Sequence, residues 1–232
     1  MKEVIAITKN MSKAFPTGEG DFWALKGISL EFARGEFSGF VGPSGSGKTT
    51  LLNILGSLDT PTKGEVEVLG HKIHQISPRQ ASYLRSQHIG FIFQTYNLLP
   101  VYNVYENVEF PLLLLKMDAA ARDKAVRDAI AWVGLTDKIK SRPNQLSGGQ
   151  CQRVAIARAM VKKPDLVLAD EPTANLDTEN SMNILDTMQT LNRELGTSFI
   201  FSTHDPKVIG YLKRIIRLID GEVASDDIAP GL

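Results

Sequence analysis

The sequence predicts an α/β protein with a mainly parallel sheet, and two observations carry that prediction. The first is a set of short aliphatic runs, of which Leu166-Val167-Leu168-Ala169 is the clearest; such runs suit strands buried on both faces beneath helices. The second is that these runs alternate with helical patterns in the C-terminal half of the chain. The expected strands cover residues 4–7, 28–32, 37–41, 66–69, 166–169, 198–202 and 215–219.

The N-terminal and middle parts of the chain depart from this alternation. The early strands are closely spaced, and this spacing predicts that they form an antiparallel side-sheet; they are the expected strands 4–7, 28–32, 37–41 and 66–69. Residues 118–133 are rich in Ala, Lys, Arg and Asp and have apolar positions at helical spacing. We therefore expect one domain over residues 1–232, with a helical subdomain inserted at about residues 95–160. The polar segment after Gly221 resembles a linker.

Composition restricts the classes of function. Lys plus Arg and Asp plus Glu each number 26, whereas a protein that binds nucleic acid through phosphates usually has a basic excess, so no nucleic-acid partner is expected. The single cysteine, Cys151, excludes an intramolecular disulfide. We see no signal peptide, and the most apolar stretch, residues 110–115, is far shorter than the ~20 residues that span a bilayer. We expect a soluble chain that reaches a membrane only through a partner.

A glycine-rich loop carries the strongest functional signal. It matches G-x-x-x-x-G-K-[ST], follows the expected strand 37–41 and precedes a helical run at 50–58, which is the context of a phosphate-binding loop. Its backbone N–H groups and the positive end of the following helix would face an anion. Lys48 would meet the β- and γ-phosphates and Thr49 could ligate Mg²⁺. The loop comprises Gly42, Pro43, Ser44, Gly45, Ser46, Gly47, Lys48 and Thr49.

Two acids follow the aliphatic run 166–169. Ligands of open α/β sheets bind at the carboxyl ends of the strands, so Asp170 is placed to hold Mg²⁺. Glu171 could polarise a water for attack on a γ-phosphoryl group. An exposed turn is the alternative, because Asp, Glu and Pro172 are all common at strand ends.

The segment Leu146-Ser147-Gly148-Gly149-Gln150 begins another expected helix. Ser147 as N-cap and Gln150 three residues later would form a capping box, and capping alone would justify both residues. It does not explain two glycines in the first turn, where they weaken a helix. Paired glycines would let an anion approach the bare N–H groups, which suggests a second phosphate-binding helix end.

Together these motifs resemble the ATP-binding subunits of ABC transporters over about residues 1–225. Residues 42–49 resemble Walker A, residues 146–150 match the LSGGQ signature letter for letter, and residues 166–171 resemble Walker B with its catalytic glutamate. Residues 174–177 resemble the D-loop, although Ala174 stands where Ser or Gly is commoner. Gln94 resembles the Q-loop glutamine and His204 the switch histidine.

The resemblance implies the ABC ATPase fold, ATP and Mg²⁺ as cofactors, and a second copy of the chain as partner. In this family two subunits pair head to tail, and the signature of one caps the ATP held by the other. Glu171 and His204 would be catalytic, while Thr49, Gln94 and Asp170 would attend the metal. ATP would be bound in cis by the Walker A residues with Phe15, Thr50 and Gln94, and in trans by Ser147, Gly148, Gly149 and Gln150.

Two assignments stay open. Phe15 lies where the family has an adenine-stacking aromatic, often Tyr; Phe22 and Trp23 are competitors, and Trp23 fits a core position better. Cys151 follows the signature, where the family usually has a polar residue. Tolerated variation explains it better than a reactive thiol at a helix N-terminus.

The run Gln94-Thr95-Tyr96-Asn97-Leu98-Leu99-Pro100 resembles the subgroup of lipoprotein-release and macrolide-export ATPases, with the cell-division ATPase a close relative. This implies a separate membrane permease, gripped by residues 96–105 and 112–115, and a location at the cytoplasmic face of the inner membrane. The alternative for residues 112–115 is that they pack the insertion. The function expected is export or extraction of lipoprotein, lipid-like or hydrophobic cargo. The alternative is an ATP-dependent regulatory module that signals through a membrane partner without transport.

Overall fold

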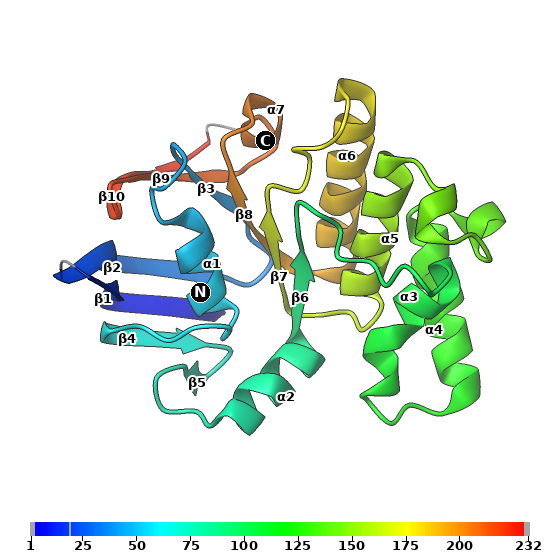
Figure 1. Cartoon of the computed structure of the whole chain (residues 1–232), viewed down its shortest axis with the longest axis horizontal. Coiled ribbons are helices and arrows are strands. Elements are labelled where there is room, and N and C mark those ends of the chain that lie inside the picture. Colours follow the sequence, from blue (N-terminus) through cyan, green and yellow to red (C-terminus); the bar gives the residue numbers. More distant parts are fainter. Residues whose placement is uncertain (1–2, 19, 230–232) are drawn as a thin grey trace.

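A computed structural model, which describes residues 3–18 and 20–229, consists of two sheets with helices between and beside them (Figure 1). The larger sheet has the order β10-β9-β3-β8-β7-β6, in which β9 to β6 run parallel and β10 is antiparallel. The smaller sheet, β2-β1-β4-β5, is antiparallel throughout. Both the mainly parallel sheet and the antiparallel side-sheet predicted from the sequence are confirmed. The strands are β1 (Val4–Thr17), β2 (Gly20–Ala33), β3 (Phe37–Val41), β4 (Lys63–Val68), β5 (His71–Lys72), β6 (Ile89–Ile92), β7 (Leu166–Asp170), β8 (Ser198–Thr203), β9 (Arg214–Ile219) and β10 (Glu222–Ile228).

The central strands β3, β8 and β7 of the larger sheet are buried on both faces, which explains why they are mostly apolar. Successive side chains of β7 alternate: Leu166 and Leu168 face α1 (Lys48–Leu55) and the antiparallel sheet, whereas Val167 and Ala169 face α5 (Gly148–Met160) and α6 (Thr178–Leu195). Helix α1 therefore lies between the two sheets, and α5 and α6 cover the opposite face (Figure 1).

The chain between β6 and β7 is mostly helical. It contains α3 (Val104–Leu113), α4 (Ala119–Trp132), two short 3₁₀ helices (Thr136–Lys138 and Pro143–Gln145) and α5. Val108, Val126 and Ile130 are buried where these helices meet. Helix α3 begins at a capping box made by Asn103 and Glu106, and α4 begins at Asp118, whose carboxylate accepts from two backbone N–H groups.

Several elements differ from the prediction. The prediction that the early strands form the side-sheet is wrong for residues 37–41, because β3 lies inside the larger sheet between β9 and β8. The polar segment after Gly221 is β10, not a linker, because an edge strand exposes most of its side chains. Strand β6 and the polar helix α2 (Pro78–His88) were not predicted.

The helical run expected at 50–58 begins earlier and ends earlier. Helix α1 starts at Lys48, directly after Gly47 at φ 98°, and ends at Leu55 before Gly56. The short α7 (Pro206–Ile209) follows β8. Within residues 3–18 and 20–229, no helix combines the length and apolar character that crossing a bilayer requires.

Candidate functional site

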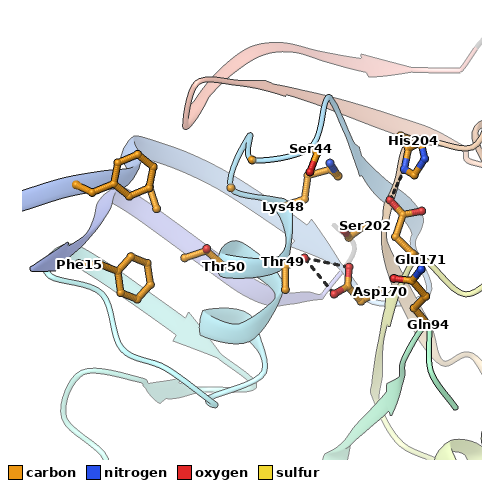
Figure 2. A pocket seen from close by; sticks show the side chains of 14 residues that line it. Phe15, Ser44, Lys48, Thr49, Thr50, Gln94, Asp170, Glu171, Ser202 and His204 are labelled. Carbon is orange, nitrogen blue, oxygen red and sulfur yellow. Dashed lines mark hydrogen bonds and ion pairs between the residues drawn. The ribbon is translucent and has the colours of Figure 1, made fainter. Parts of the chain in front are cut away.

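The carboxyl ends of β3, β8, β7 and β6 are consecutive along the larger sheet, and the residues that follow them build one pocket. Its volume of about 460 Å³ suits a nucleotide-sized ligand. Figure 2 shows side chains from the phosphate loop, from β7 and from the segments after β6 and β8 converging on it. The lining residues are Phe15, Phe22, Ala24, Ser44, Gly45, Gly47, Lys48, Thr49, Thr50, Gln94, Asp170, Glu171, Ser202 and His204.

Two glycines of the phosphate loop are required by its close packing. A Cβ at Gly42 would lie 2.1 Å from the carbonyl oxygen of Leu218, and one at Gly47 would lie 2.6 Å from that of Ala24. Gly47 is also the N-cap of α1, where no side chain caps the helix. The first N–H groups of α1 are therefore open to an anion. The pocket lining includes neither Gly42 nor Pro43 nor Ser46.

Lys48 is the cation of the pocket. Its ammonium donates to the carbonyl oxygens of Gly42 and Pro43, both at 2.8 Å. Burial lowers the pKa of Lys48, while the nearby carboxylates of Glu171 and Asp170 oppose that shift. Because its hydrogen-bond acceptors are neutral carbonyls, a polyphosphate entering the pocket would meet an unneutralised positive charge.

Two of the residues expected to bind a metal ion, Thr49 and Asp170, lie in contact. The Thr49 hydroxyl donates to Asp170, with distances of 3.0 Å to Oδ2 and 3.2 Å to Oδ1. Hydroxyl and carboxylate oxygens are hard ligands of the kind that Mg²⁺ takes. The Ser202 hydroxyl lines the same pocket, is buried and has no hydrogen-bond partner in the described chain. This donor set fits a magnesium-bound polyphosphate.

Glu171 and His204 form a pair at the pocket edge (Figure 2). The His204 Nδ1 lies 2.6 Å from Glu171 Oε1, and the Thr203 hydroxyl donates to Oε2 at 3.3 Å. Glu171 has a left-handed φ of 45°, stabilised by its N–H, which donates to Ser202 O at 2.9 Å. The chain bends at this residue, and its carboxylate lies next to His204.

The signature turn lies outside the pocket. The predicted capping box is present, because Ser147 Oγ accepts from the Gln150 N–H and Gln150 Oε1 accepts from the Ser147 N–H. Gly149 has a packing role that sequence reasoning missed: it is buried, and a Cβ there would lie 2.7 Å from Asn180 Oδ1. None of Ser147, Gly148, Gly149 and Gln150 lines the pocket.

The aromatic candidates separate into two groups. Phe15 and Phe22 are paired across the β1–β2 hairpin, are 39% and 57% exposed, and both line the pocket. Trp23 does not line it and is covered by the Lys63 ammonium, 4.8 Å from the ring centroid.

The structure does not support a reactive thiol at Cys151, because the thiol is buried and burial raises its pKa.

A second hollow, of about 460 Å³, lies between the larger sheet and the helical region. We call it the groove. Of the residues expected there, Asn97 and Leu114 line it, Tyr96 and Leu115 do not, and Leu112 is fully buried within the helices. Its apolar lining residues include Leu58, Phe91, Phe93, Phe110 and Leu114; its cations are Arg85, Arg158 and Lys162.

Comparison with known proteins identifies the family. The family model described as ABC transporter matches residues 25–174, more than half of the chain. The chain belongs to the ABC transporter family. As a member with this ATPase domain, the protein is an ATP-binding subunit that hydrolyses ATP.

Similar proteins point to one group within the family. The chain is 42% identical to the lipoprotein-releasing system ATP-binding protein LolD of Francisella tularensis over 96% of this chain and 97% of LolD. It is 44% identical to the macrolide export ATP-binding/permease protein MacB of Rhodopirellula baltica over 93% of this chain but 32% of MacB. The solved dimeric post-hydrolysis structure of the ATP-binding cassette MJ0796, bound to ADP and Pi, has a TM-score of 0.90 at 40% identity, covering 98% of this chain and 100% of that one.

Proposed function

We propose that two copies of this ABC ATPase pair head to tail around two ATP molecules and drive a separate membrane permease. The observation that carries the proposal is that the phosphate loop and the signature turn, the two helix starts expected to bind phosphate, lie apart in one chain. The phosphate loop precedes α1, on the side of the antiparallel sheet, while the signature turn begins α5 on the other side of the larger sheet (Figure 1). Head-to-tail pairing would complete each pocket with the signature turn of the other copy.

Within one copy, the phosphate-loop N–H groups and Lys48 would bind the β- and γ-phosphates. Thr49 and Asp170 would hold Mg²⁺, with Gln94 beside them in the pocket. The metal would neutralise charge on the phosphate oxygens. The lowered pKa of Lys48 reflects the burial that makes an incoming anion a favourable partner.

Hydrolysis would depend on the Glu171–His204 pair. Glu171 would accept a proton from the attacking water, and His204, 2.6 Å away, would orient the carboxylate and contact the γ-phosphate. Ser147, Gly148, Gly149 and Gln150 of the second copy would face the γ-phosphate at the start of α5, where the N–H groups of Gly148 and Gly149 are not used by the capping box. After the γ-phosphate is lost, the two copies would dissociate from each other.

Glu171→Gln should trap the dimer, because it removes the proton acceptor but keeps the side-chain shape. The measurement is size-exclusion chromatography at millimolar ATP, where we expect a dimer for Glu171→Gln and a monomer without nucleotide. Glu194→Gln, at an exposed position near the end of α6, is the matched control and should behave as the wild type. Adding Ser147→Arg should abolish the trapped dimer. A Glu171→Gln protein that stays monomeric in ATP contradicts the proposal.

The groove is the surface that we assign to the permease. It combines an apolar lining with the charges of Arg85, Arg158 and Lys162, and no Asp or Glu is among its lining residues. Phe110 and Leu114 are 41% and 66% exposed there, a degree of exposure that suits an interaction site. An amphipathic cytoplasmic helix of the permease would place its apolar face against these side chains.

Co-purification in detergent tests this docking. Leu114→Glu should abolish recovery of the permease while ATP hydrolysis by the free subunit is retained. Ile228→Glu, at a position of β10 that is 81% exposed and outside the groove, should leave recovery unchanged. Equal recovery with both variants would exclude the groove as the docking site.

The similarity to LolD and MacB supports export or extraction of lipoprotein, lipid-like or other hydrophobic cargo. The subunit would lie peripherally at the cytoplasmic face of the inner membrane, held by the permease. Reconstitution of the purified complex in vesicles tests this: ATP-dependent movement of a labelled lipoprotein is the expected result. ATP hydrolysis without any cargo movement would favour a regulatory module instead.

A further inference from the structure

The segment that follows Gln94 has an unusual backbone. Tyr96 and Asn97 have φ of 59° and 49°, the left-handed region that residues other than glycine rarely adopt. Their carbonyl groups accept from one side chain: Arg158 donates from Nη2 to Tyr96 O at 2.7 Å and from Nη1 to Asn97 O at 2.6 Å. A guanidinium can hold two carbonyls at once because its donors lie in a rigid plane. Arg158 thus stabilises the left-handed pair.

The Tyr96 side chain lies over the signature turn. A Cβ at Gly148 would be 3.0 Å from the Tyr96 hydroxyl and 3.8 Å from the carbonyl oxygen of Asn175. Asn175 in turn donates through Nδ2 to the carbonyl oxygen of Gln94 at 3.0 Å. Gly148 is therefore the point where the start of α5, the segment after Gln94 and the Asn175 segment meet, and a larger residue there would displace Tyr96.

We propose that Tyr96 and Arg158 are positioning residues for ATP hydrolysis, which lock the segment after Gln94 against the signature turn. Gln94 lines the nucleotide pocket of its own copy, whereas the signature turn would meet the ATP of the other copy. We call the contacts made by Tyr96 and Arg158 the lock. Through the lock, the position of Gln94 depends on the position of the signature turn in the same copy. This inference rests on the proposed function, because it requires the signature turn to act in trans.

The geometry separates this role from nucleotide binding in cis. None of Tyr96, Asn97 and Arg158 lines the nucleotide pocket. Gly148 and Arg158 both belong to α5, so the lock attaches the segment after Gln94 to the start and to the last turns of one rigid helix. Loss of the lock should therefore misplace the signature turn while leaving the phosphate loop intact.

The experiment uses Arg158→Lys and Tyr96→Ala, each in the wild type and in the Glu171→Gln background. Lysine keeps the charge but cannot hold both carbonyls with the same planar geometry. We expect kcat to fall about tenfold, while the affinity of a single copy for ATP, measured by calorimetry, stays within about twofold because the phosphate loop is intact. In the Glu171→Gln background, the ATP concentration for half-maximal dimer should rise about tenfold. The matched controls are Arg127→Lys, 60% exposed on α4, and Tyr83→Ala, 62% exposed on α2.

The outcomes distinguish the two proposals. If the Glu171→Gln parent does not dimerise in ATP, the proposed function is wrong. If the parent dimerises and both variants match it in kcat and ATP dependence, the lock is not a positioning device. Equal losses of kcat and cis nucleotide affinity, tracking a fall in melting temperature, would show a purely structural role and overturn the inference. Tyr96 is only half-buried, so Tyr96→Ala decides if Arg158→Lys fails to fold.

Discussion

Individual residues of the nucleotide pocket take their roles from where the backbone holds them. Lys48 donates to two carbonyls of its own loop, so its charge is available to a ligand. Glu171 adopts a left-handed conformation next to His204. The sequence motifs predicted that Lys48, Glu171 and His204 would lie in one site. The Ser202 hydroxyl, which belongs to no motif, could not be predicted because its place depends on the register of β8 between β3 and β7.

Phe15→Ala should weaken ATP binding about tenfold, because base–aromatic stacking contributes roughly 1–3 kcal/mol. One face of the Phe15 ring meets the Lys13 ammonium, 5.0 Å from the ring centroid, which leaves the other face for adenine. Phe22→Ala should have a smaller effect. Isothermal calorimetry with ATP and with inorganic triphosphate is the measurement, and only ATP should lose affinity. A larger loss for Phe22→Ala would transfer the stacking role to that residue.

At the scale of helices and strands, the elements that can be predicted from the sequence are those that are buried. Strand β7 is apolar throughout its first four residues and was predicted almost to its ends. Strand β6 is only four residues long, contains Gly90 and follows a polar helix, so no periodicity marks it. Strand β10 alternates exposed and half-buried residues at the sheet edge, where polar side chains are favoured. Gln94 follows β6, and its place in the pocket therefore came from the family resemblance alone.

The loop before α3 depends on one buried amide. Asn107 is 0% exposed; its Nδ2 donates to the carbonyl oxygens of Leu99, Tyr102 and Asn103, and its Oδ1 accepts from the Leu99 N–H. Asn107→Leu should lower the free energy of unfolding by about 2–4 kcal/mol, because buried backbone groups lose their partners. Urea denaturation measures this. Asn183→Leu, at an exposed position of α6, should change stability by less than about 0.5 kcal/mol; equal effects would contradict the prediction.

At the scale of the whole molecule, a charged cluster joins the two sheets. Arg34, which follows β2, donates to Asp165 Oδ1 at 2.5 Å and to Glu3 Oε2 at 2.7 Å. His88, at the end of α2, has Nδ1 2.7 Å from Asp165 Oδ2. These residues are far apart in the sequence and belong to no motif, so their meeting follows only from the assembled fold. Asp165 precedes β7, and the cluster therefore ties the antiparallel sheet to the strand that ends at Asp170 in the pocket.

Asp165→Asn tests this cluster through the pH dependence of stability. Burial acts to raise the pKa of Asp165, but the hydrogen bonds from Arg34 and His88 outweigh it and the pKa is lowered in the folded state. The stabilisation is therefore complete above the unfolded pKa of about 3.9 and is lost as the pH falls through the lower folded value. After screening by solvent, Asp165→Asn should lower the free energy of unfolding by about 1 kcal/mol at pH 7 and by much less near pH 2.

Denaturant titrations at both pH values measure the difference. The control is Asp128→Asn, in an exposed pair with Lys124, which should leave the free energy of unfolding almost unchanged. A deficit for Asp165→Asn that is the same at both pH values would mean that the carboxylate charge is not what joins the sheets.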